Sequence, residues 1–378
     1  MADFATIQDI VLAAKERLEP AVWDFLAGGA ESETTLARNR QALDSVALRP
    51  RVLRDVSEID TGATFLGHPL RIPVLLAPIG SLFLFDPDAA LTVAKAAARA
   101  GTVMFYSSVA DPGMAAVAEA AESPTVFMLY AKGVPEWLDA MVDKAEALGF
   151  AALGIVTESA YYSRRERDLM NRLVTKGTRT TTYAGLQRRV RAERARGIAS
   201  PGKDGLEGAM LTWELIARVR RRCRIPLVLK GIATAEDARL AVEHGVDAVY
   251  VSNHGGRSLD HGRGALDVLP EVVDAVVGRA EVIVDGGFVR GTDVLKAVAL
   301  GARAACVGRL QGWALAAGGA DALVRALDIL EEEMIVSMGL LGLARLDQLD
   351  RTYLHPASPV APPHPLGAFP VVMERLGR

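Results

Sequence analysis

The sequence of 378 residues predicts an α/β fold, a (β/α)8 barrel, from three observations. Short runs rich in Val, Ile and Leu recur eight times. Ala-rich segments with apolar residues at helical spacing lie between most of these runs. The eight units together fill about 250 residues, the usual size of such a barrel. An open doubly wound sheet is the alternative, but no early Gly-rich dinucleotide fingerprint follows the first strand.

The apolar runs predict strands that are covered on both faces, as in a barrel interior. The strands are expected at residues 73–77, 102–107, 125–130, 151–157, 226–230, 247–252, 281–285 and 304–308. The clearest helical segments between them are residues 89–100, 134–148, 235–244 and 293–300.

The barrel is expected to span residues 71–340, within one domain of residues 1–378. Three regions do not follow its alternation of strands and helices. Residues 1–65 predict an N-terminal cap of helices with a turn at residues 27–30. Residues 159–210 form an insertion after the fourth strand that is long enough to be a lid. The C-terminal tail, residues 341–378, is Pro-rich after Asp350 and is expected to run over the surface.

Composition excludes several classes of protein. Half of the residues are hydrophobic, which rules out disorder as the main state, and a net charge of −3 argues against a nucleic-acid binder. Two cysteines cannot form a disulfide framework, and we identify neither a targeting segment, a membrane span nor a metal-ligand set. The expectation is a soluble, cytoplasmic protein. The insertion carries 12 Lys or Arg against three acids over residues 164–203, so it is either a lid that draws anionic substrates or a solvated surface.

Chemistry in such a barrel collects where the strands end at the carboxyl face. The sixth strand runs into His254, two glycines and Arg257, which places a base and a carboxylate-binding cation within one turn. A structural histidine in a capped turn is the plain alternative. Lys230, Glu158 and Arg165 are predicted on the same rim, and this convergence favours a catalytic site.

The seventh and eighth strands end in glycine-rich turns that predict a phosphate site. Asp285, Gly286 and Gly287 follow one strand, and Gly308 and Arg309 follow the other. Bare backbone N–H groups and a guanidinium at these two strands are typical of phosphate binding in barrel enzymes, although two ordinary tight loops would look alike.

Lys230 ends an apolar strand, where a charge is costly unless an anion meets it. A flavin that gains negative charge on reduction is one such anion. A structural lysine paired with a buried acid is the other account.

The chain resembles the FMN-dependent 2-hydroxy acid oxidases and dehydrogenases, the group of glycolate oxidase, lactate oxidase, lactate monooxygenase and mandelate dehydrogenase. The most specific signature is Ser-Asn-His-Gly-Gly-Arg at residues 252–257. The other matching segments are residues 25–40, 77–78, 107–108, 164–168, 229–232 with 236–238, 259–260, 284–287 with 290–293, and 334–342.

The resemblance implies FMN as cofactor and assigns roles to residues. His254 resembles the base that takes a proton from the substrate 2-hydroxyl or α-carbon, Arg257 and Arg165 resemble the carboxylate clamp, and Tyr130 resembles the hydroxyl that bonds the substrate. Lys230 resembles the residue beside flavin N1 and O2, and Glu158 the carboxylate paired with the histidine. The expected FMN contacts are Pro78, Ile79, Gly80, Ser107, Met128, Lys230, Ser252, Asp285, Gly286, Gly287, Gly308 and Arg309.

Several positions depart from the family pattern. Glu158 replaces an aspartate, Phe25 replaces a substrate-binding tyrosine, and Val109 replaces an aromatic residue. Three further departures are Met128, Val156 and Val289, where glutamine, threonine and arginine are usual. We interpret these changes as a retained flavin site with a more apolar substrate site.

The expected activity is therefore oxidation of an L-2-hydroxy acid bulkier than glycolate, with O2 or another acceptor reoxidising the flavin. One alternative is a flavin-dependent tailoring oxidase or monooxygenase that acts on a non-standard substrate. Another is a non-flavin aldolase that uses Lys230 as a Schiff base. The family's habit also implies a homotetramer.

Overall fold

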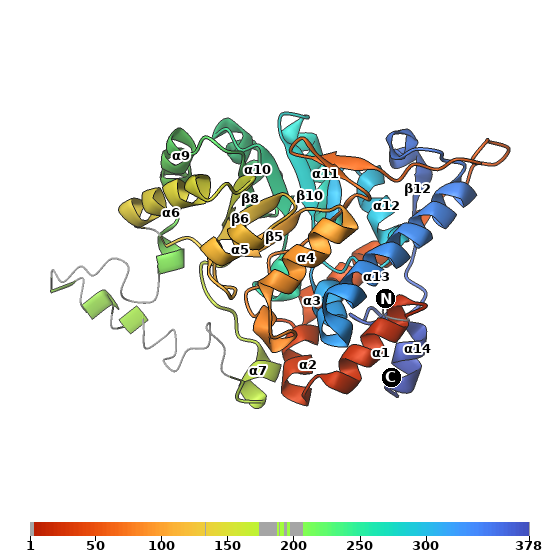
Figure 1. Cartoon of the computed structure of the whole chain (residues 1–378), viewed down its shortest axis with the longest axis horizontal. Coiled ribbons are helices and arrows are strands. Elements are labelled where there is room, and N and C mark those ends of the chain that lie inside the picture. The colour runs from red at the N-terminus through yellow and green to blue at the C-terminus, as the bar shows by residue number, and fades with distance from the viewer. Residues whose placement is uncertain are drawn as a thin grey trace.

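The computed structural model describes residues 4–132, 134–173, 187–188, 190–192, 195–196 and 207–377. Eight parallel strands close into a barrel in the order β10-β11-β4-β5-β6-β7-β8-β9, which excludes the open sheet (Figure 1). The predicted (β/α)8 barrel is confirmed, and each strand lies within or beside its expected run. The strands are β4 (Val74–Leu76), β5 (Met104–Ser107), β6 (Thr125–Leu129), β7 (Ala152–Val156), β8 (Leu227–Ile232), β9 (Ala248–Val251), β10 (Glu281–Val284) and β11 (Ala304–Val307).

Two layers of apolar side chains hold the barrel. One set of strand residues fills its interior, where Phe105 and Tyr250 meet edge to face with ring centroids 5.5 Å apart. The opposite set packs against the surrounding helices. Strands buried on both faces explain why the sequence shows continuous apolar runs. The helices around the barrel are α4 (Ala90–Ala100), α5 (Met114–Ala120), α6 (Pro135–Ala147), α9 (Trp213–Arg222), α10 (Ala235–Glu243), α11 (Ala265–Val276), α12 (Gly291–Ala299) and α13 (Arg309–Leu341), which breaks at Gly318 and Gly319.

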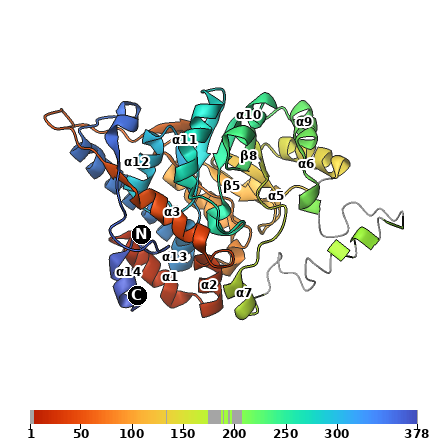
Figure 2. The ribbon, with the colours of Figure 1, turned by 180° about the vertical axis from the view of Figure 1, so that it is seen from behind.

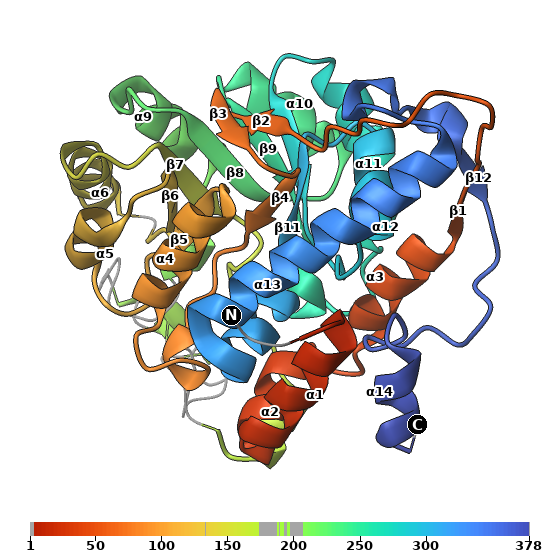
Figure 3. The ribbon, with the colours of Figure 1, turned by 45° about the vertical axis from the view of Figure 1, so that its right-hand side comes forward.

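The N-terminal cap consists of α1 (Ile7–Arg17), α2 (Pro20–Ala27) and α3 (Thr34–Asp44), as predicted. Figure 3 shows α1 and α2 alongside the start of α13. Arg40 of α3 is buried and donates two hydrogen bonds to Asp293 of α12, at 3.0 and 2.9 Å. A buried bidentate pair fixes orientation, so the cap is set firmly on the barrel. The short strands outside the barrel are β1 (Val46–Leu48), β2 (Ala63–Phe65), β3 (His68–Leu70) and β12 (Leu354–Pro356).

The tail after Asp350 is mostly exposed or half-buried, and it is docked on the rest of the protein at several points. Strand β12 pairs with β1, and α14 (Pro370–Arg375) packs beside α1. After Asp350, the buried apolar side chains of the described residues are Tyr353, Leu366, Phe369 and Val372. Proline content suggested exposure, but aromatic and aliphatic residues between the prolines bury enough apolar surface to dock the tail.

Half of the insertion at residues 159–210 falls outside the described residues. Its described beginning carries α7 (Glu166–Met170), which lies against α2 in both Figure 1 and Figure 2. Within the described ranges, we find no helix whose length and apolar character would let it cross a bilayer.

Candidate active site

A pocket of about 440 Å³ opens where the carboxyl ends of the barrel strands meet the N-terminal cap. Most of the predicted site residues line it. They are Pro78, Ile79, Gly80, Tyr130, Arg165, Lys230, His254, Arg257, Asp285, Gly286, Gly287, Gly308 and Arg309. Glu158 lies directly behind His254 and Lys230.

His254 begins a tight turn, residues 254–256, that directly follows β9. Its backbone is left-handed, with φ 58°, and its N–H donates to Ser252 Oγ at 3.0 Å. A left-handed conformation is unusual for a residue other than glycine, and such strain concentrates at functional sites. Gly256 follows with φ 75°, and a Cβ there would lie 2.6 Å from the Leu36 backbone of α3. The cap therefore presses against this turn and holds the imidazole in place.

Glu158 joins His254 to Lys230 through a single carboxylate oxygen. His254 Nδ1 lies 2.8 Å from Glu158 Oε1, and the Lys230 ammonium donates to the same oxygen. Glu158 Oε2 is buried, with no hydrogen-bond partner among the described residues. Both accounts of Lys230 thus have a basis here, because its ammonium lines the pocket and is also paired with a buried acid.

The three charges set each other's protonation. Burial alone would raise the pKa of Glu158, but the charge of Lys230 and the hydrogen bond from His254 lower it to about 2. Burial and the charge of Lys230 lower the pKa of His254 to about 4, against the opposing effect of Glu158. At neutral pH the imidazole is therefore neutral. With Nδ1–H donated to Glu158, Nε2 is free to accept a proton, and the Tyr130 hydroxyl lies 3.3 Å from it.

The pH dependence of substrate oxidation follows from these shifts. A base works only when it is unprotonated, so activity is lost as the pH falls through the pKa of His254. Because that pKa is lowered to about 4, we expect kcat/KM to stay level at mildly acidic pH. The fall should come at a pH well below 6.5, the pKa of an ordinary histidine. Glu158→Gln removes the group that raises the pKa of His254, and should shift this limb to still lower pH. A limb near 6.5 in the wild type would contradict the lowered pKa of His254, and a limb that Glu158→Gln leaves unshifted would contradict the assignment of His254 as the base.

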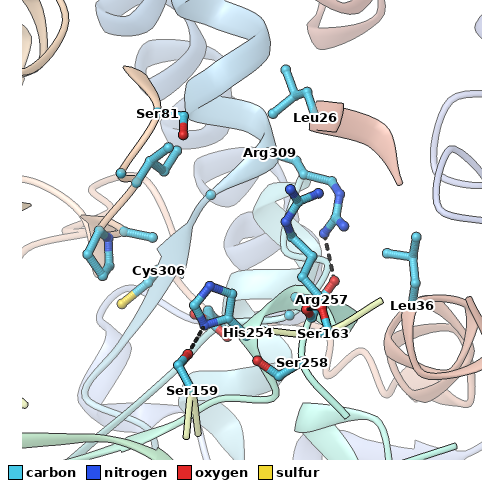
Figure 4. A pocket seen from close by; sticks show the side chains of 18 of the residues that line it. Leu26, Leu36, Ser81, Ser159, Ser163, His254, Arg257, Ser258, Cys306 and Arg309 are labelled. Carbon is cyan, nitrogen blue, oxygen red and sulfur yellow. Dashed lines mark hydrogen bonds between the residues drawn. The ribbon is translucent and has the colours of Figure 1, made fainter. Parts of the chain in front are cut away.

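Three guanidinium groups converge on the pocket without an equal number of carboxylates. Arg257 donates to the carbonyl oxygens of Phe25 and Gly28, the latter at 2.9 Å, and its guanidinium lies 4.7 Å from the centroid of the Phe25 ring. Arg165 donates to the Tyr162 hydroxyl at 3.0 Å. Figure 4 shows Arg257 and Arg309 beside His254.

This concentration of positive charge is electrostatically costly. Burial, followed by the charges of Arg165 and Arg309, lowers the pKa of Arg257 well below its ordinary value. Burial is also the main cause that lowers the pKa of Arg309 to about 10. Anionic ligands would relieve this cost, so the pocket is suited to bind them.

One end of the pocket has the features of a phosphate cradle. Arg309 begins α13, Gly308 precedes it, and the first N–H groups of a helix favour anions. Arg309 donates to the Gly28 and Gly255 carbonyls at 2.6 and 2.9 Å, while its buried Nε has no partner in the part of the chain that the structure describes. Gly286 has φ 109°, and a Cβ there would lie 2.9 Å from Asn39 Oδ1. Only glycine fits this turn, which keeps the backbone open to a ligand.

Three expected cofactor contacts do not line the pocket. Ser107 and Met128 are buried, with Met128 inside the barrel, and Ser252 donates from Oγ to Asp285 Oδ1 at 2.7 Å. Ser252 thus supports two pocket residues, since its Oγ also receives the His254 N–H. The proposed role of these three residues as direct contacts remains a prediction.

Two asparagines that had no predicted role support the site. Asn39 of α3 and Asn253 exchange side-chain hydrogen bonds at 3.0 and 2.7 Å, and Asn253 Oδ1 accepts the Gly256 N–H at 3.0 Å. Both lie in segments that carry the family resemblance, and this resemblance was the sequence signal that could have pointed to them. Their pairing is visible only once α3 is placed on the turn after β9.

Comparison with known proteins identifies the family. Residues 14–356 match the family model described as FMN-dependent dehydrogenase. The chain belongs to this family. It is therefore an enzyme of the FMN-dependent 2-hydroxy acid oxidase group, and FMN is its cofactor.

Individual relatives share much of the chain. It is 38% identical over 357 residues to an L-lactate oxidase of Nostoc sp., covering 90% of this chain and 95% of that one. It is 36% identical to glycolate oxidase 1 of Oryza sativa subsp. indica, covering 94% and 96%. A solved structure of mandelate oxidase superposes with a TM-score of 0.82 at 35% identity, covering 95% of this chain and all of the other.

The pocket fits FMN by its own chemistry. The phosphate matches the cradle of Gly308, Arg309 and the loop at Gly286, where a buried guanidinium N–H lacks a partner. Lys230 of β8 lines the same pocket, and β8 pairs with β9, the strand that leads to His254. We infer that these residues hold the two polar ends of the cofactor.

Proposed function

We propose that the protein oxidises L-2-hydroxy acids with side chains larger than that of glycolate to 2-oxo acids, and that O2 or another acceptor then reoxidises the cofactor. The observation that carries this proposal is the position of a neutral imidazole beside two guanidinium groups in one pocket. A base and a carboxylate clamp are what a hydroxy acid requires.

In the proposed reaction, each residue acts on a defined atom. Arg165 and Arg257 bind the substrate carboxylate, and the Tyr130 hydroxyl holds the substrate oxygen. His254 Nε2 takes a proton from the 2-hydroxyl or the α-carbon, and Glu158 stabilises the imidazolium that forms. Bound FMN would supply the acceptor for the two electrons and for the second proton that leave the substrate. The proton held by His254 can then leave to solvent once the product departs.

The substrate preference rests on the apolar part of the pocket wall. Phe25, Phe85, Ile79 and Val109 line it, and the two phenylalanine rings lie 6.4 Å apart. Gly80 is next to Val109, since a Cβ at Gly80 would lie 2.6 Å from Val109 Cγ2. These side chains can contact an aliphatic or aryl group of the substrate. They offer no hydrogen bond to a further hydroxyl on the substrate side chain.

The test is anaerobic stopped-flow reduction of the bound FMN by a panel of L-2-hydroxy acids: glycolate, lactate, 2-hydroxy-4-methylpentanoate and mandelate. We expect bleaching of the flavin by the larger acids at lower concentration than by glycolate. Admission of air then shows whether O2 reoxidises it. No reduction by any free acid would contradict the proposal and favour the alternative, a tailoring enzyme acting on a non-standard substrate.

Phe25→Tyr tests the modified carboxylate site. The added hydroxyl can donate a hydrogen bond worth about 1 kcal/mol, so KM for a small acid such as lactate should fall about fivefold. Phe25→Leu removes the ring that stacks on Arg257 and should raise KM instead. The two variants are compared by steady-state kinetics with lactate and mandelate. Equal KM values for all three proteins would exclude Phe25 from the substrate site.

The homotetramer and the cytoplasmic location remain predictions. Gel filtration with light scattering measures the first, and fractionation of the source cells measures the second.

A further inference from the structure

The segment that brings Arg165 into the pocket is fastened to the N-terminal cap by an ion-pair cluster. Arg167 Nε and Nη2 donate to the two carboxylate oxygens of Glu33, at 2.7 and 2.6 Å. Arg167 Nη1 lies 3.4 Å from Asp24 Oδ1, and Asn171 Nδ2 donates to Asp24 Oδ2 at 2.9 Å. The Glu31 N–H donates to the Arg164 carbonyl at 2.8 Å. The start of the insertion is therefore tied to α2 and to the loop before α3.

Glu33, which accepts two hydrogen bonds from Arg167, is itself held in place by its surroundings. Glu33 is left-handed, with φ 61°, immediately before α3. Its Oε1 also accepts the Gly29 N–H at 2.9 Å. A Cβ at Gly28 would lie 3.0 Å from Arg167 Cδ and 3.2 Å from Glu33 Oε1, so the Gly28 turn packs directly on the pair.

The same turn fixes the second clamp arginine. The Gly28 carbonyl accepts from Arg257 at 2.9 Å, and the Arg257 carbonyl in turn accepts from Ser163 Oγ. Contacts thus link three parts of the protein to one another: residues 163–167, the Gly28 turn and Arg257. Loss of the Arg167 side chain would remove the ion pair that fastens the segment of Arg165 beside the Gly28 turn.

We propose that Arg167 and Glu33 form a latch that positions Arg165 and Arg257 for the substrate carboxylate. The inference rests on the proposed function of these two arginines as a clamp. Arg167 is a positioning residue, since the pocket lining includes Arg165 and Arg257 but not Arg167. A clamp displaced by a fraction of an ångström loses bidentate geometry, so the latch acts on substrate affinity.

Stability alone does not explain the pair. The Arg167 and Glu33 side chains are 30% and 22% exposed, and ion pairs with this exposure contribute little to folding. The chain offers a matched pair far from the pocket. Arg218 of α9 makes the same bidentate contact with Asp139 of α6, at 3.0 and 2.7 Å, with side chains 41% and 20% exposed.

The experiment compares Arg167→Gln, Glu33→Gln and the control Arg218→Gln in the FMN-loaded protein. Isothermal titration calorimetry gives the Kd of a 2-oxo acid, pyruvate or benzoylformate, and anaerobic stopped flow gives the limiting rate of flavin reduction. We expect Arg167→Gln to weaken 2-oxo acid binding about tenfold, with the limiting rate within twofold of wild type. Arg218→Gln should change neither quantity.

Glu33→Gln keeps an acceptor for the Gly29 N–H but removes the ion pair, so it should weaken binding like Arg167→Gln. The double variant should bind no more weakly than either single one, because the two residues act as one unit. A Kd within twofold of wild type for Arg167→Gln, or an equal loss in Arg218→Gln, would overturn the latch. Wild-type protein that neither binds a 2-oxo acid nor is reduced by a hydroxy acid would instead overturn the proposed function, and the latch with it.

Discussion

Replacing His254 by asparagine is expected to lower the rate constant for flavin reduction by about 10²- to 10⁴-fold, the usual contribution of a general base. Asparagine suits the position because it tolerates the left-handed backbone at φ 58° and keeps a polar side chain. It cannot accept the substrate proton. Nothing in the phosphate cradle changes, so the variant should still purify with FMN.

The measurement is single-turnover reduction under anaerobic conditions, with the flavin absorbance of the purified variant as the control for cofactor content. Glu158→Gln should also reduce more slowly than wild type, because the imidazolium loses its carboxylate partner at 2.8 Å. A rate for the asparagine variant within tenfold of wild type would show that another group is the base.

Replacing Arg257 by methionine has the second large expected effect. The substrate carboxylate would lose a buried cation, a change that costs about 2–5 kcal/mol, or about 30- to 4,000-fold in kcat/KM. Methionine also removes the Arg257 donor from the Phe25 carbonyl and one of the two arginine donors from the Gly28 carbonyl. Arg257→Lys keeps the charge but not the planar fork, so we expect it to recover only part of the loss.

The corresponding 2-hydroxy amide, which has no negative charge, separates the two causes. It should reduce wild-type enzyme poorly and should lose much less than the acid does in Arg257→Met. Equal losses for the acid and the amide would mean that Arg257 acts by holding the cap and does not bind the carboxylate.

The barrel could be predicted because its signal is local. Each strand is buried on both faces and is therefore a continuous apolar run, and the residues after each run necessarily meet at one end of the barrel. This geometry alone places Lys230, His254 and Arg309 around one pocket. The predicted departures at Phe25 and Val109 also lie on its wall.

Contacts between distant segments could not be predicted. The sharing of one Glu158 oxygen by His254 and Lys230 depends on the reach of a side chain across neighbouring strands. The attachment of Arg257 and Arg309 to the Gly28 carbonyl depends on how the cap is seated. Neither leaves a periodic pattern in the sequence, and the same is true of the pairing between Arg167 and Glu33.

The Gly28 carbonyl accepts hydrogen bonds from Arg257 and Arg309, which follow Gly28 in the chain by 229 and 281 positions. During translation, at about 5–20 residues per second, Arg309 leaves the ribosome roughly 15 to 60 s after Gly28. The nascent polypeptide therefore has no complete flavin site before Arg309 has been made. We expect the cofactor to be captured only after this point, so riboflavin starvation should accumulate full-length apoprotein and not truncated chains.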